Sequence, residues 1–150
     1  MKKKGLLECA LFKRKIISLL LGILFGLLCV TLACKGGEEK IWGTALMWVI
    51  IFNRFLIGYV VFILGVFTTC PKTGIRLYPW LRGALAGALV SLDMAIGVFV
   101  SPMEDEGKMK MIFWSTILVG AFYGMIIDLL ATKFGGEGKE LLECKKEDSE

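Results

Sequence analysis

Residues 16–34 read IISLLLGILFGLLCVTLAC, a run of nineteen residues without a single charge. A helix needs about 20 apolar residues to cross roughly 30 Å of hydrocarbon at 1.5 Å per residue, so this run is long enough to span a membrane. Three further apolar stretches follow, at residues 41–69, 79–101 and 111–131. Because backbone exposed to lipid must satisfy its own hydrogen bonds, we expect each stretch to be helical. The sequence therefore predicts an all-α polytopic membrane protein, a four-transmembrane-helix bundle.

The overall composition agrees with this layout. Of the 150 residues, 56% are hydrophobic, whereas soluble domains usually carry about 45–50% apolar residues. The charged residues gather in the two ends of the chain and in short spacers between the apolar stretches. We therefore expect a single four-helix membrane domain over residues 1–150, with short charged tails at 1–15 and 132–150. Membrane lipids are the expected surroundings, and neither a nucleic acid nor a soluble partner is indicated.

The distribution of lysine and arginine predicts the orientation, because cytoplasmic flanks of membrane helices carry an excess of positive charge. One side of the predicted membrane collects thirteen of these residues and the other side only four. We therefore expect both termini in the cytoplasm and the four helices in the cell (inner) membrane. The four on the outer side are Lys35, Lys40, Lys108 and Lys110.

The residue types that are missing exclude several kinds of chemistry. The chain has no histidine, so Ser-His or Cys-His catalysis, haem with an axial histidine and histidine-containing zinc sites have no residue to use. Its five cysteines form no C-x-x-C motif, and their odd number and scattered predicted depths argue against a disulfide framework. We expect no enzyme activity, no cofactor and no metal site.

The first span has one alternative interpretation. Its end, Thr31-Leu32-Ala33-Cys34, faintly resembles a lipoprotein signal in which Cys34 would be lipidated. The apolar run is longer than the apolar segment of a typical signal peptide, which has about 7–15 residues. We therefore expect a retained helix.

Small residues recur every fourth position in three of the spans, in the pattern G-x-x-x-G. In lipid no hydrophobic force drives helices together, and small side chains let their backbones approach closely. Three such stripes in one short chain predict a tightly packed bundle or a homo-oligomer. The glycines concerned are Gly22, Gly26, Gly83, Gly87, Gly120 and Gly124.

Two charges lie inside the predicted spans, Arg54 and Asp93. Arg54 is about 18 Å of helix from Trp42, and Asp93 lies at a similar depth, so both are expected near the middle of the membrane. A charge there costs on the order of 3 kcal/mol and normally faces a partner or a water-filled cavity. We therefore expect an ion pair between helices, with Asn53 beside it, that serves either as a ligand or gating site or as a structural register.

A third charge, Asp128, lies near the cytoplasmic end of the fourth span. Its depth matches that of Arg82 and the nearby Arg76, which predicts an interfacial salt bridge.

Two functions remain compatible with these features. The first is a small integral membrane protein that acts through packing, as an assembly factor or accessory subunit. The second is a transporter or channel for a small solute or ion, which would use an Arg54/Asp93 pair on its path.

Overall fold

The computed structural model describes residues 4–36, 41–68, 77–100 and 106–138. These ranges hold four helices, namely α1 (Lys4–Gly36), α2 (Ala45–Leu64), α3 (Pro79–Val100) and α4 (Glu106–Gly135). All four are long and apolar enough to cross a membrane. The prediction of an all-helical chain with four such helices is therefore confirmed.

The helix ends differ from the expected spans. Helix α1 begins twelve residues before the apolar run, and α4 extends beyond its run at both ends. Helix α2 is shorter than expected because glycines stand at its two ends. Gly43 has a φ of 86°, a left-handed conformation that favours glycine, and Thr44 is the N-cap. At the other end Gly65 is the C-cap and donates its N–H to the carbonyl of Val61 at 3.0 Å.

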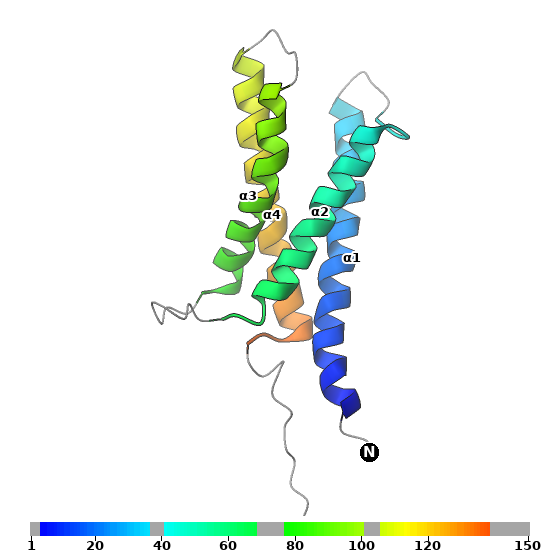
Figure 1. The fold of residues 1–150 in the computed structure, drawn as a ribbon, viewed down its shortest axis with the longest axis vertical. Coiled ribbons are helices and arrows are strands. Elements are labelled where there is room, and N and C mark those ends of the chain that lie inside the picture. The colour runs from blue at the N-terminus through cyan, green and yellow to red at the C-terminus, as the bar shows by residue number, and fades with distance from the viewer. Residues whose placement is uncertain (1–3, 37–40, 69–76, 101–105, 139–150) are drawn as a thin grey trace, which may run out of the picture.

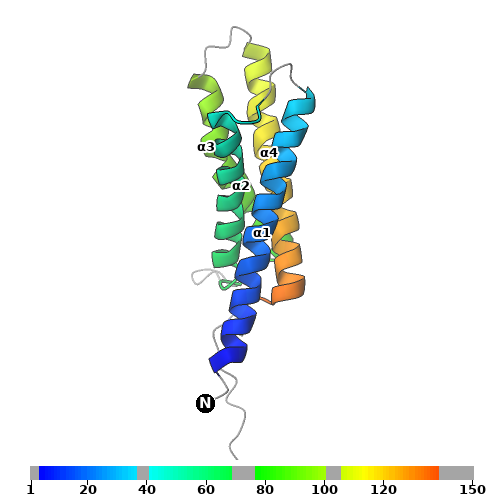
Figure 2. The same ribbon diagram turned by 90° about the vertical axis from the view of Figure 1, so that its right-hand side faces the viewer.

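The helices are arranged as two antiparallel hairpins, α1 with α2 and α3 with α4 (Figures 1 and 2). The two helices of each hairpin contact each other more extensively than any two helices from different hairpins do. In Figure 1 the hairpins lie close together at the end where α1 begins and α4 ends, and α2 and α3 separate toward the opposite end. A small apolar core joins the hairpins, and it consists of Ile57, Val61, Ala86 and Ile127.

Glycine allows α3 and α4 to approach backbone to backbone. A Cβ atom added to Gly124 would lie 2.9 Å from the Cα atom of Gly87, which is closer than real Cβ atoms come. A Cβ on Gly83 would lie 2.7 Å from the Cβ of Asp128, and one on Gly87 would overlap the carbonyl of Gly120. At these three positions the atoms of the neighbouring helix therefore leave room for glycine only.

The first hairpin uses glycine in the same way. A Cβ on Gly22 would lie 2.8 Å from the carbonyl oxygen of Arg54, and one on Gly26 would lie 3.0 Å from the Cα of Ile51. All six glycines singled out in the sequence thus stand where two helices of the same chain meet. Since these stripes are used inside one chain, they give no support to a homo-oligomer, which stays a prediction.

Two glycines of α3 form a matched pair for testing this packing. We expect Gly87→Ala to lower the free energy of unfolding by about 1–3 kcal/mol, because the added methyl group overlaps the α4 backbone. Gly97→Ala should leave stability unchanged or slightly higher, because a Cβ there meets no atom within 4 Å and alanine favours the helix. Unfolding of both variants in detergent, followed by circular dichroism, measures the difference. Equal stabilities would show that α3 and α4 do not pack this closely.

Candidate functional site

One carboxylate joins three helices at the end of the molecule where α1 begins and α4 ends. Asp128 of α4 accepts a hydrogen bond from Arg14 Nη2 at 2.6 Å, and it forms two with Arg82, from Nε at 2.7 Å and from Nη2 at 2.9 Å. The side chains of Arg14 and Asp128 are fully buried and that of Arg82 is 2% exposed. This cluster therefore ties α1 and α3 to α4 through charges that are shielded from solvent.

Further acceptors surround the two arginines. Thr132 Oγ1 lies 3.2 Å from Arg14 Nη1, and Glu137 Oε2 lies 3.4 Å from Arg82 Nη2. Arg14 Nη1 also donates to the carbonyl of Gly136, just beyond the end of α4. Even so, Arg14 Nε and Arg82 Nη1 have no hydrogen-bond partner among the described residues. Two N–H groups of the arginines are thus left without an acceptor. Asp128 is the carboxylate that pairs with both positive charges.

Backbone from two other helices encloses Arg14. A Cβ on Gly65, at the end of α2, would overlap the Arg14 guanidinium, and a Cβ on Gly135, the last residue of α4, would lie 2.8 Å from the Arg14 Cα. Gly138, with a φ of 83°, donates its N–H back to the carbonyl of Gly65 at 2.9 Å. All four helices therefore meet around the cluster.

The sequence indicated part of this cluster. The predicted ion pair of Asp128 with Arg82 is present and is buried among the helices, whereas Arg76 lies outside the described residues. Arg14 is one of the thirteen basic residues on the predicted cytoplasmic side, and its sequence neighbours there are charged. Ser18, Gly22 and Gly26 follow it at four-residue spacing, which places Arg14 on the same face of the helix as these small residues.

The third buried arginine, Arg54, has neutral partners on all four helices. Its Nη1 donates to Ser91 Oγ on α3 at 2.9 Å and to Asn53 Oδ1 on α2 at 3.2 Å. Its Nε lies 3.4 Å from Cys29 Sγ on α1, and its guanidinium carbon lies 5.4 Å from the ring centroid of Tyr123 on α4. A cation over an aromatic ring is attracted by the electrons of its face. Arg54 is therefore stabilised by dipoles and a ring at the centre of the bundle.

The expected ion pair between Arg54 and Asp93 is not formed. Among the described residues no carboxylate makes an ion pair with Arg54, which is 5% exposed, whereas Asp93 is exposed. The prediction of this pair uses only the similar depths of the two residues and not the rotation of their helices. Ser91 faces Arg54, and a residue two positions further along an α-helix is turned by about 200°, so Asp93 points away from it. The transport hypothesis loses the pair on which it rested.

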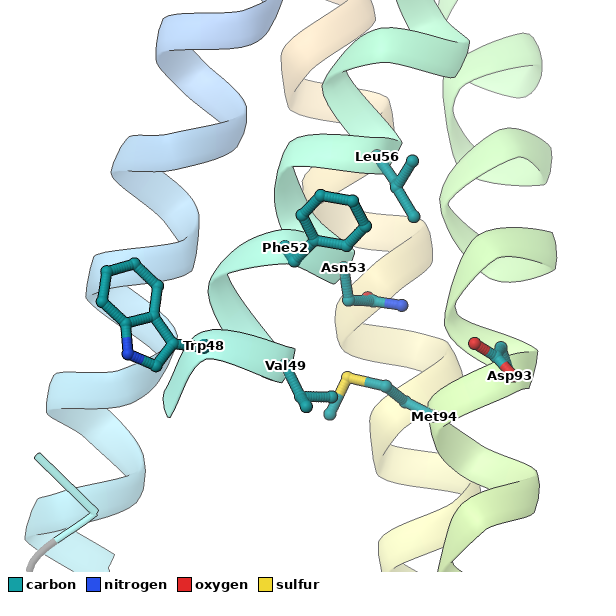
Figure 3. A pocket seen from close by; sticks show the side chains of 7 residues that line it. All are labelled: Trp48, Val49, Phe52, Asn53, Leu56, Asp93 and Met94. Atoms are coloured by element: carbon teal, nitrogen blue, oxygen red, sulfur yellow. The ribbon is translucent and has the colours of Figure 1, made fainter. Parts of the chain in front are cut away.

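Asp93 instead lines a pocket of about 370 Å³ between α2 and α3. Figure 3 shows Asn53 and Asp93 pointing into the space between the two helices, while Met94 extends toward Val49. The Asn53 amide also donates to the carbonyl of Val90 at 3.1 Å, which fixes its orientation. Asn53 thus connects the pocket to the Arg54 network. The lining residues are Trp48, Val49, Phe52, Asn53, Leu56, Asp93 and Met94.

The lining of the pocket is mostly apolar. Five of its seven lining side chains are apolar, and the two polar ones are a carboxylate and an amide, which do not make a nucleophile–base pair. Within the described part of the chain, no three metal-ligating side chains come together.

No protein family, no curated protein and no solved structure matches the chain significantly.

The stability of the protein should respond differently to asparagine at position 128 and at position 93. Asp128→Asn removes the carboxylate that two buried arginines share and leaves only Arg82 with another, Glu137, so we expect it to lower the free energy of unfolding by about 3–5 kcal/mol. Asp93→Asn changes an exposed group with no partner among the described residues and should alter stability by less than about 0.5 kcal/mol. Denaturation of the two variants side by side in the same detergent measures this contrast. A stable Asp128→Asn variant would mean that the cluster does not hold the helices.

Proposed function

We propose that the four helices cross the cell membrane with both termini in the cytoplasm. This orientation is supported by the thirteen lysines and arginines on the predicted cytoplasmic side, compared with four on the other side. The ends of α1 and α4 that carry the exposed Lys13, Lys15 and Lys133 belong to the same end of the molecule, together with the Asp128 cluster. In this orientation the cluster lies toward the cytoplasm, and the hairpins separate toward the outer side.

Thiol labelling tests the orientation. Cys34 stands at the predicted outer end of α1, whereas Cys144 belongs to the predicted cytoplasmic tail. In cells that produce a variant with Cys34 alone, a membrane-impermeant maleimide should label the protein. The variant with Cys144 alone should be labelled only after the cells are permeabilised. The reverse pattern would contradict the proposed orientation.

We further propose that the protein acts as an accessory or assembly component, which binds another membrane-embedded molecule in the pocket between α2 and α3. The observation that carries this proposal is Asp93, a carboxylate exposed in an otherwise apolar pocket. At mid-membrane depth an unpaired charge costs on the order of 3 kcal/mol, which binding of a partner would offset. The buried charges Arg14, Arg54, Arg82 and Asp128 already bond to groups on other helices.

The lining of the pocket supports a binding partner that arrives from within the membrane. Trp48 and Phe52 are 64% and 62% exposed, so the pocket is open at its side. Exposed apolar side chains next to isolated polar groups are typical of ligand-binding surfaces. In the proposed orientation this side faces lipid, which gives a molecule in the bilayer direct access without passage through water.

Photo-cross-linking tests whether the pocket is occupied. A photoreactive phenylalanine analogue replaces Phe52 in the pocket or, as the control, Leu118, which is 66% exposed on α4 and does not line the pocket. After irradiation in native membranes, intact-mass spectrometry should show one discrete adduct at position 52 and only a spread of bulk-lipid adducts at position 118. The same spread at both positions would contradict a binding function for the pocket.

A further inference from the structure

The Asp93 carboxylate is the only charge that lines the pocket between α2 and α3. No described residue donates a hydrogen bond to it or forms an ion pair with it. The amide of Asn53, which shares the pocket, is held by Val90 and by Arg54. The pocket therefore presents a single negative charge that the rest of the chain leaves uncompensated.

The described residues supply no cation at this position. The guanidinium of Arg54 is committed to Cys29, Asn53 and Ser91 inside the bundle. The described lysines lie near the helix ends. A second copy of the chain has the same buried arginines and terminal lysines, so it brings no positive charge to this depth. The complementary cation has to come from a different molecule.

The shape and lining of the pocket favour a small amphiphile over a protein helix. Trp48, Phe52 and Leu56 form a row of large side chains along α2, whereas helices that pack against each other in a membrane meet through small residues. A volume of about 370 Å³ lies within the range of small-molecule sites. The two aromatic rings also suit an ammonium group, which aromatic faces attract.

We infer that this pocket is a binding site for an amphiphilic cation, a molecule with an amine or quaternary ammonium head and an apolar tail. The head pairs with the Asp93 carboxylate and lies beside Phe52 and Asn53, and the tail leaves through the open side of the pocket. This inference rests on the proposed binding function and names the chemical class of the ligand.

A binding experiment on the full chain tests the inference. The protein is purified in a neutral maltoside detergent, with Trp42, Trp80 and Trp114 replaced by phenylalanine so that Trp48 in the pocket is the sole fluorophore. The probes are dodecyltrimethylammonium and dodecanol, which share a tail and differ in the charge of the head. We expect a saturable change in Trp48 fluorescence with the cation and a response at least about tenfold weaker with the alcohol.

Variants extend the test to the residue itself. Asp93→Asn should weaken binding of dodecyltrimethylammonium by about tenfold or more, whereas Asp93→Glu should retain most of it. Leu118→Asn, a polar change on the exposed face of α4, should have no effect. Equal responses to the two probes, or full binding by Asp93→Asn, would overturn the inference.

The failure of this inference is distinguishable from the failure of the proposed function. If the photoreactive group at position 52 captures one discrete adduct while the cation does not bind, the pocket is a binding site for another class of molecule. A captured polypeptide would identify that class as a membrane helix. If no discrete adduct forms and the cation does not bind, both proposals fail.

Discussion

The fold depends on one carboxylate removed from solvent. Asp128 accepts hydrogen bonds from Arg14 and Arg82, which come from the first and third helices, and so connects segments far apart in the chain. Removing three charged groups from water is costly, and their mutual attraction offsets this only when the geometry is good. The required proximity is provided by glycine: without side chains at Gly65 and Gly135, the neighbouring backbones close around Arg14. The ion cluster and the glycine contacts therefore depend on each other.

The bundle stabilises its other buried cation by a different physical means. Arg54 has no counterion among the described residues and is surrounded by hydroxyl, amide and thiol groups and a tyrosine ring. Neutral acceptors spread the stabilisation over all four helices, so no single partner determines the position of the guanidinium. Asp93, which would have been its simplest partner, stays at the surface of the bundle. The protein thus retains a charge that its own packing does not need.

Much of the fold was predictable from the sequence, because apolar length determines which segments form long helices and four-residue spacing places small residues on one helix face. The site was less predictable, because contacts between helices depend on how each helix is rotated. Arg54 and Asp93 share a depth, but Ser91 rather than Asp93 has the rotation that faces Arg54. The burial of Arg14 is hard to predict because a charge in a basic flank is usually solvated. Only its alignment with Ser18, one turn further on, indicated a buried position.

The ion cluster also bears on how the protein is made. The two partners Arg14 and Asp128 are 114 positions apart in the chain, so the arginine is synthesised long before its counterion. Each hairpin consists of neighbouring helices and is able to close as soon as its second helix has emerged. The contacts of Arg14 and Arg82 with Asp128 form only after the fourth helix has emerged. A chain that stops before the fourth helix would hold Arg14 and Arg82 without the carboxylate that both of them contact.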